Sequence, residues 1–430
     1  MTTPLHHPSI PSSTTPPNPQ ENSPLFITLP PELRTLIFTY TLTSYPNPDP
    51  LKTYDKETYW SRPGYTAPQI TSTALLRTCK RVYAETWFLP FALSEHTIYL
   101  TARERAPGNH LNDSAITRPR LNPGSRFRSR SGDGNPNENG NGNTLRQSLS
   151  LINDIHGPLQ ETGNIQVFAQ LYLLEPGRAF QAILDAPYLK PRAVRLTIRY
   201  TDFWHWERCE PLWIDGRWVQ SVRFPDTVRE FRMDFEMIER RKGEVEVLVS
   251  QAVERWVFRR RDGKVLRAGA GAGDVVVTKW TGSSVFGGRR WVRDEVRPGE
   301  LDYVVYTVTW RVDSSSGPDP AQPGRSQTMG DSDGEHGDSD GDEHEDSSDD
   351  NGNEAPTIRV PANFIQPAPP LPDCSSLPES EMRLAGVTAA MPAAEAVAAV
   401  QAFRRHMLAA RTRSMVIGQG TLVRQRWDVP

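Results

Sequence analysis

The stretch Val228–Met237, with the sequence VREFRMDFEM, decides the fold class. Apolar and charged side chains alternate along it, with Phe231, Met233 and Phe235 set against Arg232, Asp234 and Glu236. Strict alternation of this kind is typical of a β-strand with one buried face. A helix is expected next, because apolar side chains then recur on one helical face: Val245, Leu248, Val249, Ala252, Val253 and Trp256.

Further strands and one more helix are expected on both sides of this pair. Upstream, PGRAFQAILDAPYL (176–189) predicts a helix with Phe180, Ile183 and Leu184 inward, and SEHTIYL (94–100) and AVRLTIRY (193–200) predict strands. Downstream, a hairpin is expected about Asp262 and Gly263, followed by the strands DVVVTKW and LDYVVYTVTWRV. This order predicts an α+β layer, a mostly antiparallel sheet with one face covered by helices.

Two short helical patterns precede these elements. In Ser23–Tyr40, Pro30 and Pro31 suit the first turn of a helix, and an apolar face follows: Leu33, Leu36, Ile37 and Tyr40. A second pattern, ALLRTCKRVYAET, places another set on one side: Leu75, Cys79, Val82, Tyr83 and Thr86. Since each helix has one apolar face, we expect the two faces to pack together.

The strings LPPELRTLIFTYTL and LLRTCKRVYAE resemble the F-box and, more closely, the F-box-like N-termini of a large group of poorly characterised fungal proteins. In the F-box family the leading Leu-Pro and the helix after it bind the Skp-type adaptor of cullin ubiquitin ligases, and the rest of the chain selects a protein substrate. The resemblance implies an adaptor-facing surface made of Leu29, Pro30, Leu33, Ile37 and Phe38. An F-box runs almost without interruption, whereas residues 43–73 separate the two patterns here.

The resemblance to these fungal proteins extends into the second half of the chain. It rests on LTIRYTDFWHWERCEPLWI and FPDTVREFRMDFEMIERRK, and it carries no assigned activity. It therefore supports a recognition domain and implies nothing about chemistry.

Composition limits how much of the chain can be packed. Among 430 residues there are 38 Pro and 30 Gly, and only 37% are hydrophobic, so long segments are expected to be disordered. The expected organisation is a disordered 1–23, an F-box-like helical module at 24–101, a disordered linker at 102–144, an α+β recognition domain at 145–312, a disordered acidic and Pro-rich segment at 313–378, and an Ala-rich helix and tail at 379–430. In that last helix a stripe is expected to dock within the chain: Ala396, Val400, Phe403, Met407 and Ala410.

Charge and cysteine usage indicate the compartment and the partners. Residues 331–350 hold 11 of the 52 acidic side chains and no Lys or Arg, so we expect an acidic segment that folds back on a mildly basic body. Three scattered cysteines give no disulfide framework. With no secretory signal and no apolar run of about 18 residues, a soluble cytoplasmic or nuclear protein without a membrane partner is expected. We attribute the arginines of residues 118–130 to solvation, and a nucleic-acid partner is not expected.

No catalytic, cofactor or metal site is predicted. GAGAG (269–273) does not match the dinucleotide-binding pattern, and GSSVFGG (282–288) does not match the nucleophile elbow. The acidic segment does not match the calcium-binding loop. His205 and Cys209 lack the second pair of ligands that a structural zinc site needs. A candidate aromatic recognition patch remains, formed by Trp204, Trp206, Trp213 and Trp218. The alternative, which we favour, is that these tryptophans are core residues at the end of the sheet.

Two non-enzymatic functions follow. The first is a substrate adaptor that couples an F-box-like module to a cullin-type ubiquitin ligase through a Skp-type adaptor. The second is a scaffold or binding protein of unknown partner, which keeps the helices as core and does not engage the ubiquitin machinery. An enzyme ranks third, because no nucleophile with its base and no cofactor loop is visible.

Overall fold

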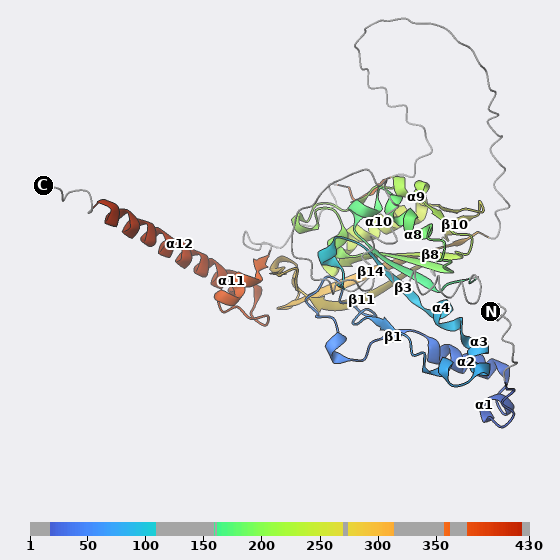
Figure 1. Ribbon diagram of the computed structural model, residues 1–430. Helices are drawn as coiled ribbons and strands as arrows, with labels where there is room; N and C mark the ends of the chain where they lie inside the picture. The colour runs from blue at the N-terminus through green and yellow to red at the C-terminus, as the bar shows by residue number, and fades with distance from the viewer. Residues whose placement is uncertain are drawn as a thin grey trace, which may run out of the picture.

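The computed structural model describes residues 18–108, 159, 161–269, 274–313, 357–361 and 376–423, with side chains up to residue 410. The fold is a mixed α+β arrangement built on one large sheet that curls into a half-barrel (Figure 1). In Figure 1, helices α8, α9 and α10 lie above this sheet, and the N-terminal segment with β1 lies below it.

The large sheet has nine strands in the order β3-β4-β5-β8-β14-β10-β9-β7, with β11 also paired to β14. Their bounds are β3 Glu95–Leu100, β4 Asn164–Ala169, β5 Ala193–Ile198, β7 Arg223–Phe224, β8 Glu230–Ile238, β9 Phe258–Arg260, β10 Val265–Ala268, β11 Val275–Ser283 and β14 Glu300–Val312. Strands β3, β4, β5 and β8 run parallel to one another. Strand β14 is antiparallel to β8, β10 and β11.

The expectation of a mostly antiparallel sheet was wrong, because half of the sheet is parallel. Strand β4 was missed in the sequence, and it lies between two predicted strands. The chain then crosses from β4 to β5 through α7 (Leu171–Leu174) and α8 (Arg178–Leu184). Such a crossover connection returns the chain in the same direction and so makes the paired strands parallel.

The other predicted strands and the helix after β8 are confirmed, whereas the second helical pattern divides into a 3-10 turn, η2 (Ala74–Arg77), and a helix, α3 (Lys80–Thr86). The helix after β8 is α10 (Lys242–Arg255), and Val245, Leu248 and Ala252 are fully buried. The hairpin about Asp262 and Gly263 joins β9 to β10. Gly263 adopts a φ of 81°, a left-handed conformation that favours glycine at this turn.

The other helices and strands are short, except for α12, which has 31 residues. The helical elements are α1 Pro24–Ile27, α2 Pro31–Leu42, η1 Pro50–Lys52, η2 Ala74–Arg77, α3 Lys80–Thr86, α4 Leu89–Leu93, η3 Arg103–Arg105, η4 Tyr200–Asp202, η5 Trp206–Arg208, α9 Arg217–Ser221, η6 Glu239–Arg241, η7 Val292–Asp294, α11 Glu379–Leu384 and α12 Ala393–Val423. The strands outside the large sheet are β1 Tyr45–Pro46, β2 Gln69–Ile70, β6 Trp213–Ile214, β12 Val285–Phe286, β13 Arg289–Arg290, β15 Ile358–Arg359 and β16 Leu377–Pro378.

The two faces of the large sheet differ in chemistry. On the face covered by helices, Phe231, Met233 and Phe235 are fully buried, as the alternation of β8 predicts. On the opposite face, Asp234 and Glu236 are also buried, at 3% and 2% exposure. Because a buried charge is costly unless it is paired, this second face must carry an ion-pair network.

The N-terminal helices share the main core with the sheet. One hydrophobic cluster contains Phe38, Leu42 and Val82 together with the buried residues of the central strands. Strand β3, which belongs to residues 24–101, also joins the large sheet. The helical module therefore packs on the recognition domain and has no separate core among the described residues.

Short parts of the segments expected to be disordered pack on the fold. In 102–144, Ala106 is buried. In 313–378, Ile358 of β15 and Leu377 of β16 are fully buried, and they pair with β6 and β13 respectively. The acidic segment 331–350 and the arginines of 118–130 lie outside the described residues.

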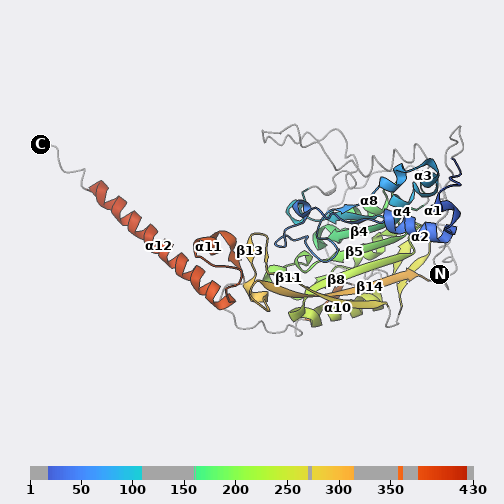
Figure 2. The ribbon, with the colours of Figure 1, turned by 90° about the horizontal axis from the view of Figure 1, so that it is seen from below.

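Helix α12 leaves the body of the protein (Figure 2). Its first turns dock as expected, because Ala396, Val397 and Val400 form a small cluster with Val292, Leu377 and Met382. Met407 and Ala410 are exposed, so docking covers only the start of the predicted stripe. None of the helices in the described ranges has the length and apolar character that crossing a bilayer requires.

Candidate interaction surface

The exposed face of α1 and α2 is the candidate partner-binding surface. Pro30 is the N-cap of α2 and Pro31 its first residue, in agreement with the sequence analysis. Arg34 Nη1 donates to the Leu29 carbonyl at 3.0 Å and holds the turn between the two helices. The ring of Phe26 in α1 lies under the guanidinium groups of Arg34 and Arg81, with Cζ–centroid distances of 5.3 and 4.1 Å. These contacts fix α1 against α2 and α3.

Helix α2 has two apolar faces, and the structure buries the smaller one. Phe38 and Leu42 are 3% and 0% exposed. The predicted inward face is instead open: Leu33 is 47% exposed, Leu36 49%, Ile37 41% and Tyr40 77%. Ile27 of the preceding helix α1 is also exposed, at 63%. We call these five side chains the α1–α2 apolar surface.

Two expectations about α2 are thus corrected. Its Leu33 face does not pack on the second helical pattern, because Phe38 and Leu42 already fill the contact with the core. For the same reason Phe38 is not available to an adaptor. Of the other residues implied by the resemblance, Pro30, Leu33 and Ile37 are exposed and Leu29 is half-buried.

The tryptophan patch divides into core and surface. Trp218 is fully buried against Phe180 and Trp256, and Trp206, at 3% exposure, packs against Trp291 with ring centroids 4.4 Å apart. Trp204 and Trp213 are half-buried and stack in parallel at 5.8 Å. The core alternative therefore holds for two of the four tryptophans, and the other two form a small surface pair.

A half-buried carboxyl group, that of Glu175, supports this surface pair. Glu175 Oε2 accepts a hydrogen bond from Trp204 Nε1 at 2.8 Å, and its Oε1 accepts one from the Asp215 backbone N–H at 3.0 Å. Burial raises the pKa of Glu175 to about 7 although both donors favour its charged form. Glu175 thus changes charge near neutral pH while it positions Trp204.

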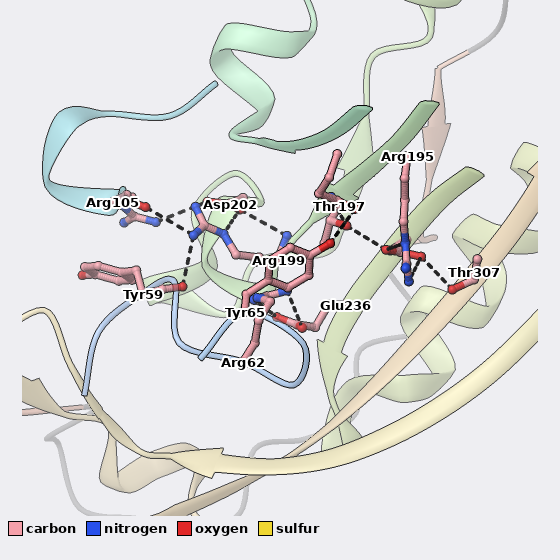
Figure 3. A network of polar contacts seen from close by, with 12 residues as sticks. Tyr59, Arg62, Tyr65, Arg105, Arg195, Thr197, Arg199, Asp202, Glu236 and Thr307 are labelled. Atoms are coloured by element: carbon pink, nitrogen blue, oxygen red, sulfur yellow. Dashed lines mark hydrogen bonds and ion pairs between the residues drawn. The ribbon is translucent and has the colours of Figure 1, made fainter. Parts of the chain in front are cut away.

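An ion-pair network occupies the face of the sheet opposite the helices (Figure 3). Asp234 accepts hydrogen bonds from Arg195 Nε at 2.6 Å, Thr197 Oγ1 at 2.7 Å and Thr307 Oγ1 at 2.6 Å. Glu236 binds both terminal nitrogens of Arg62 at 2.9 Å. Asp234 and Glu236 are therefore each paired with an arginine, and Asp234 also accepts two hydroxyl hydrogen bonds, as buried charges require.

The same network also binds residues 43–73, the segment that separates the two F-box-like helical patterns. Besides Arg62, Tyr65 of this segment donates to Glu95 at 2.5 Å, and the Tyr59 carbonyl accepts from Arg199 Nη1 at 3.0 Å. Arg199 is itself held by Asp202 at 2.5 and 3.0 Å. In the sequence, residues 43–73 look like a spacer between the two helical patterns. Their role in the network was missed because Arg62 and Tyr65 give no periodic signal.

The described residues hold no cluster of metal-binding side chains. Among them, no three His, Cys, Asp or Glu side chains gather in a way that would hold a metal ion. His205 and Cys209, at φ of 51° and 55°, stand at the two ends of η5 and share no helical face. The glycine run 269–273 lies almost wholly outside the described residues.

Comparisons with known proteins give no further guide. No protein-family model matches the chain, and no curated protein and no solved structure matches it.

Proposed function

We propose that this protein is a non-enzymatic interaction protein whose α1–α2 apolar surface binds a Skp-type adaptor of a cullin ubiquitin ligase. The observation that carries the proposal is the exposure of Leu33, Leu36, Ile37 and Tyr40 on one side of a short helix. A contiguous apolar surface on a folded protein is costly to leave in water and marks an interaction site. The resemblance of this stretch to the F-box supplies the class of partner.

In this proposal the α+β domain holds a protein substrate. Helices α1 and α2 are fixed to that domain through Phe38, Leu42 and the shared core. A rigid connection of this kind would keep a bound substrate at a constant distance from the ligase.

The scaffold function is the second candidate, and a specific observation favours it. Phe38, which the resemblance places toward the adaptor, is buried in the main core. In this reading α2 is a structural helix, and its exposed side chains bind a partner outside the ubiquitin machinery.

One co-precipitation separates the two candidates. The intact protein and the double variant Leu33→Asp/Ile37→Asp are used as baits in extract of the source organism. Leu51→Asp is the matched control, because Leu51 is 91% exposed and lies in η1, outside α1 and α2. Recovery of adaptor and cullin by the intact protein and the control, but not by the double variant, supports the ligase function. Absence of both from all three samples would move the protein to the scaffold class.

A further inference from the structure

Strand β11 forms an edge of the large sheet along all nine of its residues. Its strand partner among the described residues is β14, in a continuous antiparallel register from Val275↔Val308 to Ser283↔Glu300. In Figure 1, β11 lies at the lower margin of the sheet, below β14. The second side of β11 is therefore open over the described part of the chain.

Hydrogen bonds at both ends of this pair show which backbone groups point outward. Thr309 N donates to the Asp274 carbonyl and Ser284 N donates to the Gly299 carbonyl, both at 2.9 Å. In an antiparallel pair, hydrogen-bonded residues alternate, so the even-numbered residues of β11 face β14. The N–H and C=O groups of the odd-numbered residues point away from the sheet, and no hydrogen bond from another described backbone group reaches them: Val275, Val277, Lys279, Thr281 and Ser283.

This edge has little protection against pairing with another strand. Natural edges are protected by prolines, bulges or charged side chains, especially lysine. Here the strand contains no proline and its register is unbroken. Its single charged side chain is engaged, because Lys279 Nζ binds Glu239 Oε1 at 2.7 Å. Val276 and Val277, at 50% and 48% exposure, leave apolar surface beside the open backbone groups.

A cavity of about 640 Å³ adjoins the C-terminal half of this edge. It lies between Trp280–Ser283 of β11 and the segment 55–63 that the ion-pair network holds in place. Arg62 in its wall is neutralised by Glu236. Asp55 and Glu57, by contrast, form no ion pair with a described residue, and burial, Asp55 and Glu379 together raise the pKa of Glu57. With Lys56 between them, this part of the wall has two acidic side chains and one basic side chain, and so an excess of negative charge.

We propose that the β11 edge accepts an extended segment of a partner polypeptide as an additional strand, and that a lysine or arginine of that segment enters the cavity beside Asp55 and Glu57. In strand addition, main-chain hydrogen bonds supply affinity and side-chain pockets supply specificity. Here the β11 edge provides the main-chain hydrogen bonds, and the acidic cavity provides the side-chain pocket. This site is separate from the α1–α2 apolar surface and does not depend on its function.

A second copy of this chain fits the edge less well than such a partner. The one charged side chain of a second β11 is Lys279, which is already bound to Glu239 and so supplies no unpaired cation for the cavity. A basic extended peptide brings such a cation.

The test uses the whole protein and synthetic fluorescent peptides. The probe has seven residues of alternating threonine and valine with one central arginine; a second peptide has glutamate in that place, and a third carries N-methyl groups on alternate backbone nitrogens. The variant Val277→Pro removes one outward N–H and leaves the bonds to β14 in place, because Pro is tolerated where the N–H faces solvent. Val277→Ala is its matched control, and Glu57→Lys tests the cavity.

Binding is measured by fluorescence anisotropy. The arginine peptide is expected to bind the intact protein and Val277→Ala alike, and to bind Val277→Pro and Glu57→Lys about tenfold more weakly. The glutamate and N-methylated peptides are expected to lose binding to a similar extent, which tests the proposal even if Val277→Pro does not fold. Equal binding of the arginine and N-methylated peptides would overturn it, as would absence of binding to the intact protein. A dimer that Val277→Pro dissociates would assign the edge to a second copy of the chain and overturn the partner assignment.

Discussion

Breaking the ion pair between Arg62 and Glu236 should destabilise the protein more than removing the pair entirely. The two side chains are 8% and 3% exposed and make two parallel bonds of 2.9 Å. Replacing one partner leaves the other charge buried and unpaired, which costs about 3–5 kcal/mol. Since a domain of this kind has a total stability of about 5–15 kcal/mol, Arg62→Met or Glu236→Met alone should lower the free energy of unfolding by a large fraction.

The double variant Arg62→Met/Glu236→Met should recover most of that loss, because apolar side chains of similar volume replace both charges without leaving either unpaired. Urea unfolding followed by tryptophan fluorescence gives the four free energies of this cycle. Lys242→Ala is the control, since its pair with Glu239 at 3.8 Å is largely exposed and should contribute less than about 1 kcal/mol. Single variants that cost no more than this control, or a double variant that costs their sum, would refute the account of the network in Figure 3.

Two further predictions concern α2 and Glu175. Phe38→Ala should lower the free energy of unfolding by about 3–5 kcal/mol, because it empties a core position, whereas Ile37→Ala on the exposed face should cost much less; similar losses in urea unfolding would show that the faces of α2 are assigned wrongly. The pKa of Glu175 is raised from 4.5 to about 7 by burial, so the native state holds this proton more tightly than the unfolded state, and its contribution to stability should be lost as the pH rises from about 4.5 to 7. Relative to Glu175→Gln, the intact protein should therefore be less stable at pH 7.5 than at pH 5, and a difference that does not change with pH would contradict the raised pKa.

Periodicity in the sequence was sufficient for the elements with one apolar face. Strand β8 and helix α10 follow directly from the spacing of their apolar side chains, and the hairpin follows from Asp262 and Gly263. Strand β4 was missed because Gln166, a polar residue that is fully buried, interrupts its apolar pattern. Without β4 there was no sign of the crossover, so the parallel half of the sheet could not be predicted.

The candidate surfaces were harder to predict than the fold, because burial is decided by tertiary contacts. Helix α2 carries apolar side chains on two sides, and its spacing alone cannot tell that Phe38 faces the core while Leu33 and Ile37 face solvent. Similarly, Trp204 and Trp218 look equivalent in the sequence. The open edge of β11 is a property of strand order, which alternation does not encode.

Direct titration of a purified Skp-type adaptor into this protein tests the central claim, that the α1–α2 apolar surface is a ligase-adaptor interface. Calorimetry should show binding to the intact protein and to Leu51→Asp, and a loss of at least about tenfold for Leu33→Asp/Ile37→Asp, whose charged side chains would have to be buried on binding. Equal binding by the intact protein and the double variant, or binding by neither while both remain folded, would contradict the claim.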